Sequence, residues 1–276
     1  MRVVKTKKKS SAALALAPEA MGEEIRSLVV EMSWRSKSGE TGSALSISDI
    51  LAVLYGRILS IDPKKPALPR RDRFILSKGH GAAALYATLA LCGFFPVKNL
   101  LRYRVNDGLF HGHPSFGTIP GIEVSTGSLG HGLAIGAGMA LALSGTSSKV
   151  YVLIGDGECN EGSIWEAALF IGSRGLSNII AIVDDNKFQG FGATGETNRF
   201  DLGAQWQSFG WEVMHADGHD CVDLEKKFRK AAGVTRPTVL IARTVAGKGV
   251  PLIENTLAAH YFVADEASAR QIRKNA

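Results

Sequence analysis

Two turns that carry oxygen-bearing side chains interrupt the most apolar part of the sequence. The first has the sequence Gly-Asp-Gly, centred on Asp156, and follows the apolar run Val150–Ile154. The second contains Asn186 and follows the apolar run Ile179–Val183. Such β-branched runs are typical of buried strands, and a right-handed crossover makes consecutive strands of this kind parallel. We therefore expect Asp156 and Asn186 side by side at the carboxyl edge of a sheet, where ligands bind in α/β folds.

The side chains at this edge suit a divalent cation and a diphosphate. The Asp156 carboxylate and the Asn186 amide oxygen are hard ligands of the kind that Mg²⁺, Ca²⁺ or Mn²⁺ prefers, and the Phe188 carbonyl offers a further oxygen. Gly155 and Gly157 let the main chain approach a diphosphate closely. A lone Gly-Asp-Gly sequence is usually only a turn, so the prediction depends on the pairing of two turns across one strand–helix–strand unit.

Strand-like and helix-like patterns alternate along the rest of the chain. This alternation predicts an α/β fold with a parallel sheet flanked by helices on both faces. The predicted strands are Arg73–Leu76, Val150–Ile154, Ile179–Val183, Trp211–His215 and Thr238–Ala242. The predicted helices are Glu19–Lys37, one that begins with a capping box from Ser46 to Asp49 and runs to Ile58, Gly79–Cys92, Leu129–Leu143, Ile164–Ser173 and Cys221–Ala232. The stretch Asp107–Ser128 lacks periodicity and is predicted to be a functional loop.

The basic charge of the chain is concentrated at its N-terminus. The net charge is +6, and five basic residues lie within the first nine positions, which leaves 6 − 5 = +1 for the remainder. A nearly neutral body gives no reason to expect nucleic-acid binding. Residues 1–18 are predicted to be a disordered basic arm, and residues 19–276 to form a single α/β domain.

The apolar content points to neither a membrane span nor an oxidising compartment. No apolar run of the sequence approaches the roughly 20 residues that a helix needs to cross a bilayer. The three cysteines, Cys92, Cys159 and Cys221, are odd in number, widely spaced and match no metal-binding template. We therefore expect no membrane contact and a reducing, cytoplasmic location.

The stretch Tyr151–Gly192, with its Gly-Asp-Gly turn and later Asn, resembles the thiamine-diphosphate motif, and more narrowly the N-terminal part of transketolase. The resemblance extends from about Glu19 to His260. Further matching segments follow in family order: Arg71–Leu89, Gly112–Ser115, Gly121–Gly132, Phe209–Val213, Asp217–Asp220, Lys248–Val250 and His260. The resemblance implies a thiamine-diphosphate-binding fold, with thiamine diphosphate and Mg²⁺ as cofactors.

Three histidines acquire roles through this resemblance. His80 and His113 match histidines that line the cofactor and the sugar channel, and His260 matches one that contacts the donor. A side chain that titrates near neutrality suits proton transfer to hydroxyl and carbonyl oxygens. The flanks of His260 depart from the family pattern, and His111 is close enough to His113 to exchange roles with it.

The remaining site residues follow from the same likeness. Ser128, Leu129 and His131 match a segment that packs on the cofactor, although a helix-capping turn is an equal alternative for His131. Glu158 is expected beside the diphosphate. Glu161 matches a glutamate at the subunit interface, or is simply an acid at a helix N-terminus.

Two smaller expectations concern neighbours of the metal ligands. Asp185 precedes Asn186 and is expected to orient it. Cys159 lies near the diphosphate in the sequence but is expected to serve packing. Trp165, Trp206 and Trp211 are expected in the core or at an interface.

Two departures from the family shape the functional prediction. Glu40 stands where the family has a donor-binding histidine, which puts the usual sugar donors in question. The chain also stops before the pyrimidine-binding domain that supplies the activating glutamate. We therefore expect the N-terminal subunit of a split transketolase, active as an α₂β₂ complex with a subunit that carries that domain.

The predicted reaction is the transfer of a two-carbon ketol unit from a ketose to an aldose, with sugars or sugar phosphates as substrates. One alternative is a specialised ketol or acyl transferase of secondary or unusual-sugar metabolism. Another is a non-catalytic subunit that keeps the fold without turnover.

Overall fold

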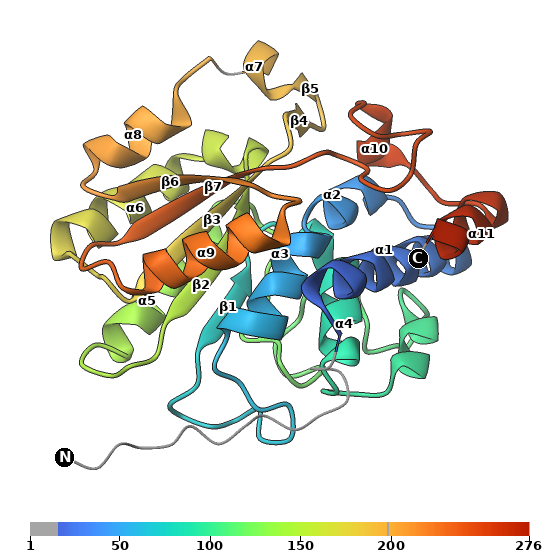
Figure 1. The fold of residues 1–276 in the computed structure, drawn as a ribbon, viewed down its shortest axis with the longest axis horizontal. Coiled ribbons are helices and arrows are strands. Elements are labelled where there is room, and N and C mark those ends of the chain that lie inside the picture. Colours follow the sequence, from blue (N-terminus) through green and yellow to red (C-terminus); the bar gives the residue numbers. More distant parts are fainter. Residues whose placement is uncertain (1–15, 198, 276) are drawn as a thin grey trace.

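The computed structural model describes residues 16–197 and 199–275 (Figure 1). The predicted disordered arm, residues 1–18, therefore lies almost entirely outside the described residues. Its last residue, Pro18, is the first residue of helix α1 (Pro18–Ser36). Proline is well suited to this position because the first N–H groups of a helix have no intrahelical partner.

A five-stranded sheet forms the centre of the molecule, and all its neighbouring strands run parallel. Its spatial order is β1 (Arg73–Leu76), β2 (Val150–Gly155), β3 (Ile179–Asp185), β7 (Thr238–Arg243) and β6 (Glu212–Asp217). All five strands were predicted, β2 and β3 from their apolar, β-branched runs. The fold class is thus confirmed as a parallel α/β sheet.

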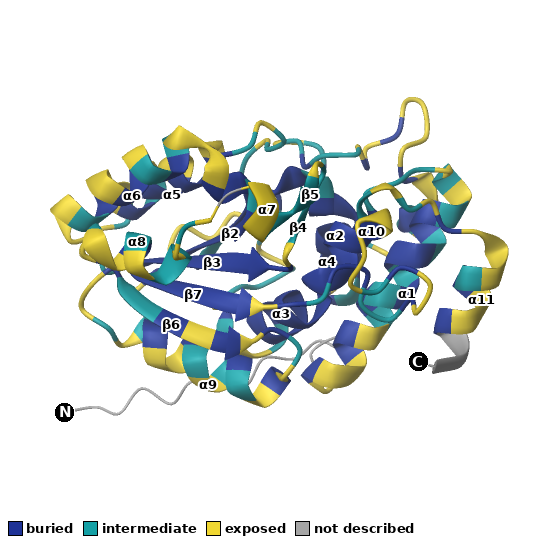
Figure 2. Ribbon diagram, turned by 90° about the horizontal axis from the view of Figure 1, so that it is seen from above, coloured by how far each residue is buried: buried dark blue, intermediate teal, exposed yellow. Residues whose placement is uncertain are grey.

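Helices cover both faces of this sheet (Figure 2). Tyr151 and Leu153 point into a core shared with helices α1, α3 (Ser48–Val53), α4 (Ala82–Leu91) and α9 (Cys221–Ala232). Val152 and Ile154, one residue out of phase, point into a second core shared with α5 (His131–Ala142) and α6 (Gly162–Arg174). Because side chains alternate between the faces of a strand, a strand with both faces covered must be apolar throughout.

The segment after α1 differs from the prediction. A short helix, α2 (Thr41–Ser46), precedes α3, and α3 passes into a π-helical turn at Leu54–Ile58. The predicted capping box was wrong, because Ile47 is the residue before α3 and no side chain caps that helix. The Ser46 hydroxyl is buried and is used for a tertiary hydrogen bond to Asp184 instead.

Several short elements were not predicted. They are the hairpin strands β4 (Phe188–Gln189) and β5 (Gly192–Ala193), and the helices α7 (Thr194–Thr197), α8 (Leu202–Ser208) and α10 (Ala258–Tyr261). The short helix at the end of the chain is α11 (Glu266–Asn275). The stretch Asp107–Ser128 is a loop, as predicted. None of the helices in the described part of the chain combines the length and apolar character that a bilayer crossing requires.

Candidate cofactor site

A cavity of about 620 Å³ opens at the carboxyl ends of β2 and β3. It is lined by nearly all of the residues that the sequence singled out. These are Glu40, His80, His113, Leu129, Gly155, Asp156, Gly157, Glu158, Glu161, Asn186, Phe188 and His260. Ser128 and His131 are not among the lining residues. Segments far apart in the sequence thus converge on one hollow at the edge where α/β folds bind ligands.

Asp156 and Asn186 lie at this edge because β2 and β3 are adjacent and in register. Gly155, the last residue of β2, pairs with Asp184, so Asp156 follows the end of β2 level with Asp185, and Asn186 follows one position later at the end of β3. Both side chains are buried, with exposed fractions of 3% and 6%. The Asp156 carboxylate accepts hydrogen bonds from Gly157 N–H, Lys187 N–H and the Thr194 hydroxyl.

The electrostatics of Asp156 suit a cation. The pKa of this carboxyl is raised to about 7, chiefly by burial and also by the charges of Asp184 and Asp185, against a hydrogen bond from Thr194 that lowers it. A carboxylate that is costly to ionise where it lies is stabilised when a positive ion is placed beside it. Its two oxygens keep acceptor capacity beyond the three bonds described, since a carboxylate has about four lone-pair sites.

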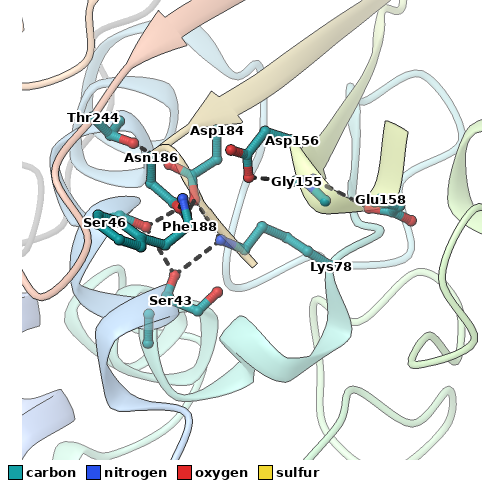
Figure 3. A network of polar contacts seen from close by, with 12 residues as sticks. Ser43, Ser46, Lys78, Gly155, Asp156, Glu158, Asp184, Asn186, Phe188 and Thr244 are labelled. Atoms are coloured by element: carbon teal, nitrogen blue, oxygen red, sulfur yellow. Dashed lines mark hydrogen bonds and ion pairs between the residues drawn. The ribbon is translucent and has the colours of Figure 1, made fainter. Parts of the chain in front are cut away.

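Asp184 is the hub of the polar network below the cavity (Figure 3). Its carboxylate is fully buried and pairs with the Lys78 ammonium. It also accepts hydrogen bonds from the Thr244 hydroxyl, from the Ser46 hydroxyl at 2.8 Å and from Asn186 Nδ2 at 2.9 Å. The last bond turns the amide oxygen of Asn186 away from Asp184. This oxygen accepts a hydrogen bond from Phe188 N–H at 3.0 Å and keeps a second lone pair for a ligand.

The expectation that Asp185 orients Asn186 was therefore wrong. Asp184 holds the amide, while Asp185 pairs with the Lys187 ammonium at 2.7 Å. Successive residues of a strand point to opposite faces, and this alternation directs Asp184, not Asp185, toward Asn186 and Lys78.

Lys78 was missed altogether by the sequence analysis. Its side chain is 1% exposed, and its ammonium donates to the Ser43 carbonyl at 3.1 Å as well as to Asp184. Burial alone would raise the pKa of Asp184, but the Lys78 charge and hydrogen bonds from Lys78, Thr244 and Ser46 hold it below its usual value. A buried lysine needs such a partner, because an unpaired charge in the interior costs several kcal/mol.

Glu158 joins the two glycine turns of the cavity. Its carboxylate accepts hydrogen bonds from Ser77, from Gly130 N–H at 2.7 Å and from Gly155 N–H at 3.2 Å. Burial raises the pKa of Glu158. This side chain lines the cavity, and its hydrogen bonds hold the backbone at Gly130 and at Gly155.

Three histidines face the cavity from separate elements. The rings of His80 and His260 lie 6.2 Å apart, and the His113 ring packs against Gly127. Burial, with smaller contributions from Lys78 and the other histidines, lowers the pKa of His80 to about 3, and burial also lowers that of His260. His80 is thus a neutral imidazole at pH 7, which differs from the expected titration near neutrality. His111 bonds to Ser115 and Gly108 and does not line the cavity.

The outer part of the cavity presents polar atoms that have no hydrogen-bond partner among the described residues. Glu40 Oε2, Ser43 Oγ and Gln189 Nε2 are buried and accept or donate no hydrogen bond within the described residues. Glu40 adopts a left-handed backbone conformation (φ 67°), and the Arg104 guanidinium lies 3.6 Å from its carboxylate. Buried polar atoms usually have a partner, so atoms such as these indicate a polar ligand or water in the cavity.

A contact across the mouth of the cavity was also missed. The Tyr261 hydroxyl on α10 donates to the Gly190 carbonyl at the tip of the β4–β5 hairpin, at 2.6 Å. A side chain at Gly190 would meet the His260 ring at 3.1 Å. The neighbouring Phe191 is 95% exposed. No local sequence pattern signals this contact, because it joins residues 71 positions apart.

The other predicted residues lie at the margin. His131 is exposed at the start of α5, and its Nδ1 bonds to the Leu129 carbonyl at 3.0 Å. Glu161 precedes α6 and is exposed, without a side-chain capping bond. Cys159 is fully buried in the core, as expected.

The oxygen ligands at this edge suit a divalent ion that also binds a diphosphate better than an ion held by protein side chains alone. Within residues 16–197 and 199–275, no three His, Cys, Asp or Glu side chains lie close enough to hold an ion. Mg²⁺ commonly takes one or two carboxylates and completes its shell with phosphate oxygens and water. Asp156, the Asn186 amide and glycine backbone around them match that requirement.

Comparisons with known proteins agree with this geometry. Residues 18–276 match the family model described as transketolase, thiamine diphosphate binding domain. The chain is 42% identical over 242 residues to the 6-deoxy-6-sulfo-D-fructose transketolase subunit SqwG of Clostridium sp. (strain MSTE9), covering 86% of this chain and 87% of that one. It is 39% identical over 249 residues to a subunit of the apulose-4-phosphate transketolase of Phocaeicola vulgatus, covering 89% and 88%.

Solved structures give the same result. Transketolase from Leishmania mexicana superposes with a TM-score of 0.90 at 27% identity, covering 94% of this chain but 41% of the longer one. Transketolase from Campylobacter jejuni gives 0.86 at 30% identity, covering 97% and 43%. The chain thus spans about two fifths of the solved transketolases and most of the length of the related subunits. It belongs to the transketolase family of transferases, as a subunit whose residues 18–276 match the thiamine-diphosphate-binding domain.

Proposed function

We propose that this chain is the N-terminal subunit of a two-component transketolase. The enzyme transfers a two-carbon ketol unit from a ketose to an aldose, and it needs a second subunit that carries the pyrimidine-binding domain. The observation that carries the proposal is the pair of Asp156 and Asn186 at the edge of a polar cavity, in a chain of this family. Residues 19–276 act as one binding domain in this proposal.

Thiamine diphosphate and Mg²⁺, or Ca²⁺ or Mn²⁺ in its place, are the proposed occupants of the cavity. Asp156, the Asn186 amide and the Phe188 carbonyl hold the ion, and Gly155 and Gly157 admit the diphosphate. Glu158, Ser128, Leu129 and His131 serve the cofactor side of the cavity. The bound cofactor supplies an electron sink for breaking and forming carbon–carbon bonds.

The three cavity histidines hold and move protons on the sugar. His80, which is neutral at pH 7, is suited to orienting a hydroxyl or carbonyl oxygen by hydrogen bonding. His113 and His260 approach the same space from other elements. A role for Glu161 at the interface between subunits rests on its exposed position beside the cavity.

The surface supports the proposal of a partner chain. Ile135, Leu141, Leu169 and Phe170 are exposed on α5 and α6, which pack against each other. Exposed apolar side chains on two neighbouring helices are compatible with a surface that another subunit covers. An α₂β₂ complex in the cytoplasm is proposed, and the three cysteines, which are buried and carry no disulfide in the described residues, are compatible with a reducing compartment.

A second candidate function concerns the donor. Related subunits are named for 6-deoxy-6-sulfo-D-fructose and for apulose-4-phosphate. Glu40, whose carboxylate faces the cavity with one oxygen that accepts no hydrogen bond and lies 3.6 Å from the Arg104 guanidinium, favours a donor that offers a hydroxyl at this place. A specialised ketol transfer from a modified sugar is therefore the alternative, whereas the retained Asp156 and Asn186 give no support to a non-catalytic subunit.

Reconstitution tests the proposal. The purified chain, its candidate partner, MgCl₂ and thiamine diphosphate are mixed with a panel of ordinary and modified ketoses and an aldose acceptor. Ketol transfer is expected only when both subunits are present. Sustained transfer by this chain alone would contradict the proposal, and faster turnover of modified sugars than of pentose phosphates would favour the specialised form.

A further inference from the structure

The segment Asp217–Asp220, with the sequence Asp-Gly-His-Asp, has no role in the cavity described above. It connects β6 to α9 at the carboxyl edge of the sheet. Its histidine, His219, lies on the opposite side of β7 from Asp156 and does not line the cofactor cavity. The contacts of His219 nevertheless lead into that cavity.

The hydrogen bonds of His219 define which ring nitrogen carries the proton. Val245 N–H donates to His219 Nε2 at 2.9 Å, and His219 Nδ1 lies 2.8 Å from a carboxylate oxygen of Asp49. Because a backbone N–H can only donate, Nε2 is the acceptor and the proton is on Nδ1, from which it is donated to Asp49. His219 is therefore held as one tautomer between a carboxylate and a backbone amide.

Asp49 is built to stay ionised in this position. Its carboxylate also accepts a bond from Arg26 at 2.8 Å, and its side chain is 5% exposed. Burial alone would raise the pKa of Asp49, but the bond from His219 and the charge of Arg26 hold it below its usual value. Gly22 makes room for the carboxylate, because a side chain there would meet Asp49 Oδ1 at 2.2 Å.

The segment that His219 holds is part of the cofactor cavity. On one side of Val245, the Thr244 hydroxyl donates to Asp184, which holds Asn186. On the other side, Ala246 lines the cavity directly. The next residue, Gly247, donates its N–H to the carbonyl of Gly42 at 3.2 Å, and Gly42 also lines the cavity.

The glycine of the motif serves the same arrangement. Gly218 N–H donates to the Arg243 carbonyl at 2.7 Å. A side chain at Gly218 would meet the Thr244 methyl group at 2.3 Å, so the loop lies directly against Thr244 only because this residue is glycine. Gly218 thus contacts Arg243 and Thr244, while His219 contacts Val245.

We infer that His219 is a positioning residue for the cofactor: by binding Val245 N–H, it fixes the segment from Thr244 to Gly247 and, through Thr244 and Asp184, the amide of Asn186. This inference rests on the proposed function, because it assigns the fixed segment to thiamine diphosphate and its metal ion. Residues that orient ligand-bearing side chains from behind typically change affinity by about 10- to 100-fold when lost.

The test uses two substitutions that separate the two bonds of His219. In His219→Gln the amide oxygen reaches the position of Nε2 and still accepts from Val245, whereas in His219→Asn the shorter amide reaches only the position of Nδ1 and still donates to Asp49. His215→Ala, an exposed histidine on β6, is the control. The dissociation constant of thiamine diphosphate is measured by calorimetry at saturating MgCl₂, with the chain in complex with its partner subunit.

The Asn variant is expected to bind thiamine diphosphate about tenfold more weakly, and the Gln and His215→Ala variants within about twofold of the native complex. The kcat of the Asn variant at saturating cofactor stays near the native value. If the Asn variant loses thermal stability but binds the cofactor as tightly as the Gln variant, His219 is only structural and the inference is overturned. If the native complex binds no thiamine diphosphate, the proposed function itself fails.

Discussion

The floor and the rim of the cavity are built in opposite ways. The cavity floor, comprising Lys78, Asp156, Asp184, Asn186 and Thr244, is buried, and every side chain in it bonds to another part of this chain. The cavity rim consists of Glu40, Gln189, Phe191, His260 and Tyr261. It exposes aromatic surface and leaves polar atoms of Glu40 and Gln189 without hydrogen-bond partners in the described part of the chain.

Contacts within this chain complete the floor, whereas the rim leaves hydrogen-bonding groups and apolar surface for another molecule. The floor is a closed network, and a closed buried network holds its groups in a fixed geometry. The rim offers hydrogen-bonding capacity and apolar surface to something outside the chain. In our account the floor anchors the cofactor, while the substrate and the partner subunit complete the rim.

Breaking the floor should have the largest effect on stability. Lys78→Ala leaves the Asp184 carboxylate buried without its cation, and we expect the free energy of unfolding to fall by about 3–5 kcal/mol. Lys187→Ala is the matched control, because this ammonium also pairs with an aspartate but is largely exposed, and it should cost less than about 1 kcal/mol. Urea unfolding measures both, and similar losses would contradict a buried, closed floor.

Asp156→Ala should remove the response to the cofactor. At a thiamine diphosphate concentration 100 times the dissociation constant, bound cofactor stabilises the native complex by about 2.7 kcal/mol, and the variant should lose this gain. The control is Asp72→Ala, since Asp72 is also buried and bonds to the N–H groups of Ser60 and Lys149 away from the cavity. Thermal unfolding with and without cofactor compares the two variants. If Asp156→Ala is still stabilised by the cofactor, Asp156 does not anchor it.

Asp49→Asn tests the contribution of Asp49, which holds His219 behind the floor, through the pH dependence of stability. Because the pKa of Asp49 is lowered by folding, its contribution is fully present above the ordinary pKa near 4 and is lost as pH falls through the lowered value. We expect the variant to be less stable by about 2 kcal/mol at pH 7, with the difference shrinking below about pH 4. Asp220→Asn, an N-cap substitution that preserves capping, should change little at either pH.

A rim substitution should have the smallest effect on stability. Tyr261→Phe removes one exposed hydrogen bond to Gly190 and should lower the free energy of unfolding by about 1 kcal/mol or less. The amides of Phe191 and Gly192 should exchange hydrogen faster, because the hairpin tip loses its tie to α10. Unchanged exchange, or a loss as large as that of Lys78→Ala, would mean that the rim is not the open region described here.

The sequence predicted the parts of this arrangement that follow from local pattern. Apolar, β-branched runs located β2 and β3, and the crossover rule made these two strands parallel, which brought Asp156 and Asn186 to one edge. The assignment of Asp185 instead of Asp184 failed for a physical reason. A strand buried on both faces shows no polar alternation, so the sequence does not reveal which aspartate points toward the cavity.

Long-range partners were equally hidden. Ser46 matched a capping box, but its hydroxyl bonds to Asp184, 138 positions away. Nothing local marks Lys78 as buried, because its counter-charge, Asp184, lies on β3, 106 positions away. The tie between Tyr261 and Gly190 likewise depends on where α10 and the hairpin meet. Such contacts are set by tertiary packing, on which local patterns carry no information.

Locating the metal ion tests the central claim most directly. Crystals of the complex are soaked with thiamine diphosphate and Mn²⁺, and the anomalous signal of Mn²⁺ gives the position of the ion. We predict a peak between the Asp156 carboxylate and the Asn186 amide oxygen, about 2.0–2.3 Å from each. A peak elsewhere, with these two oxygens facing only protein or water, would contradict the account.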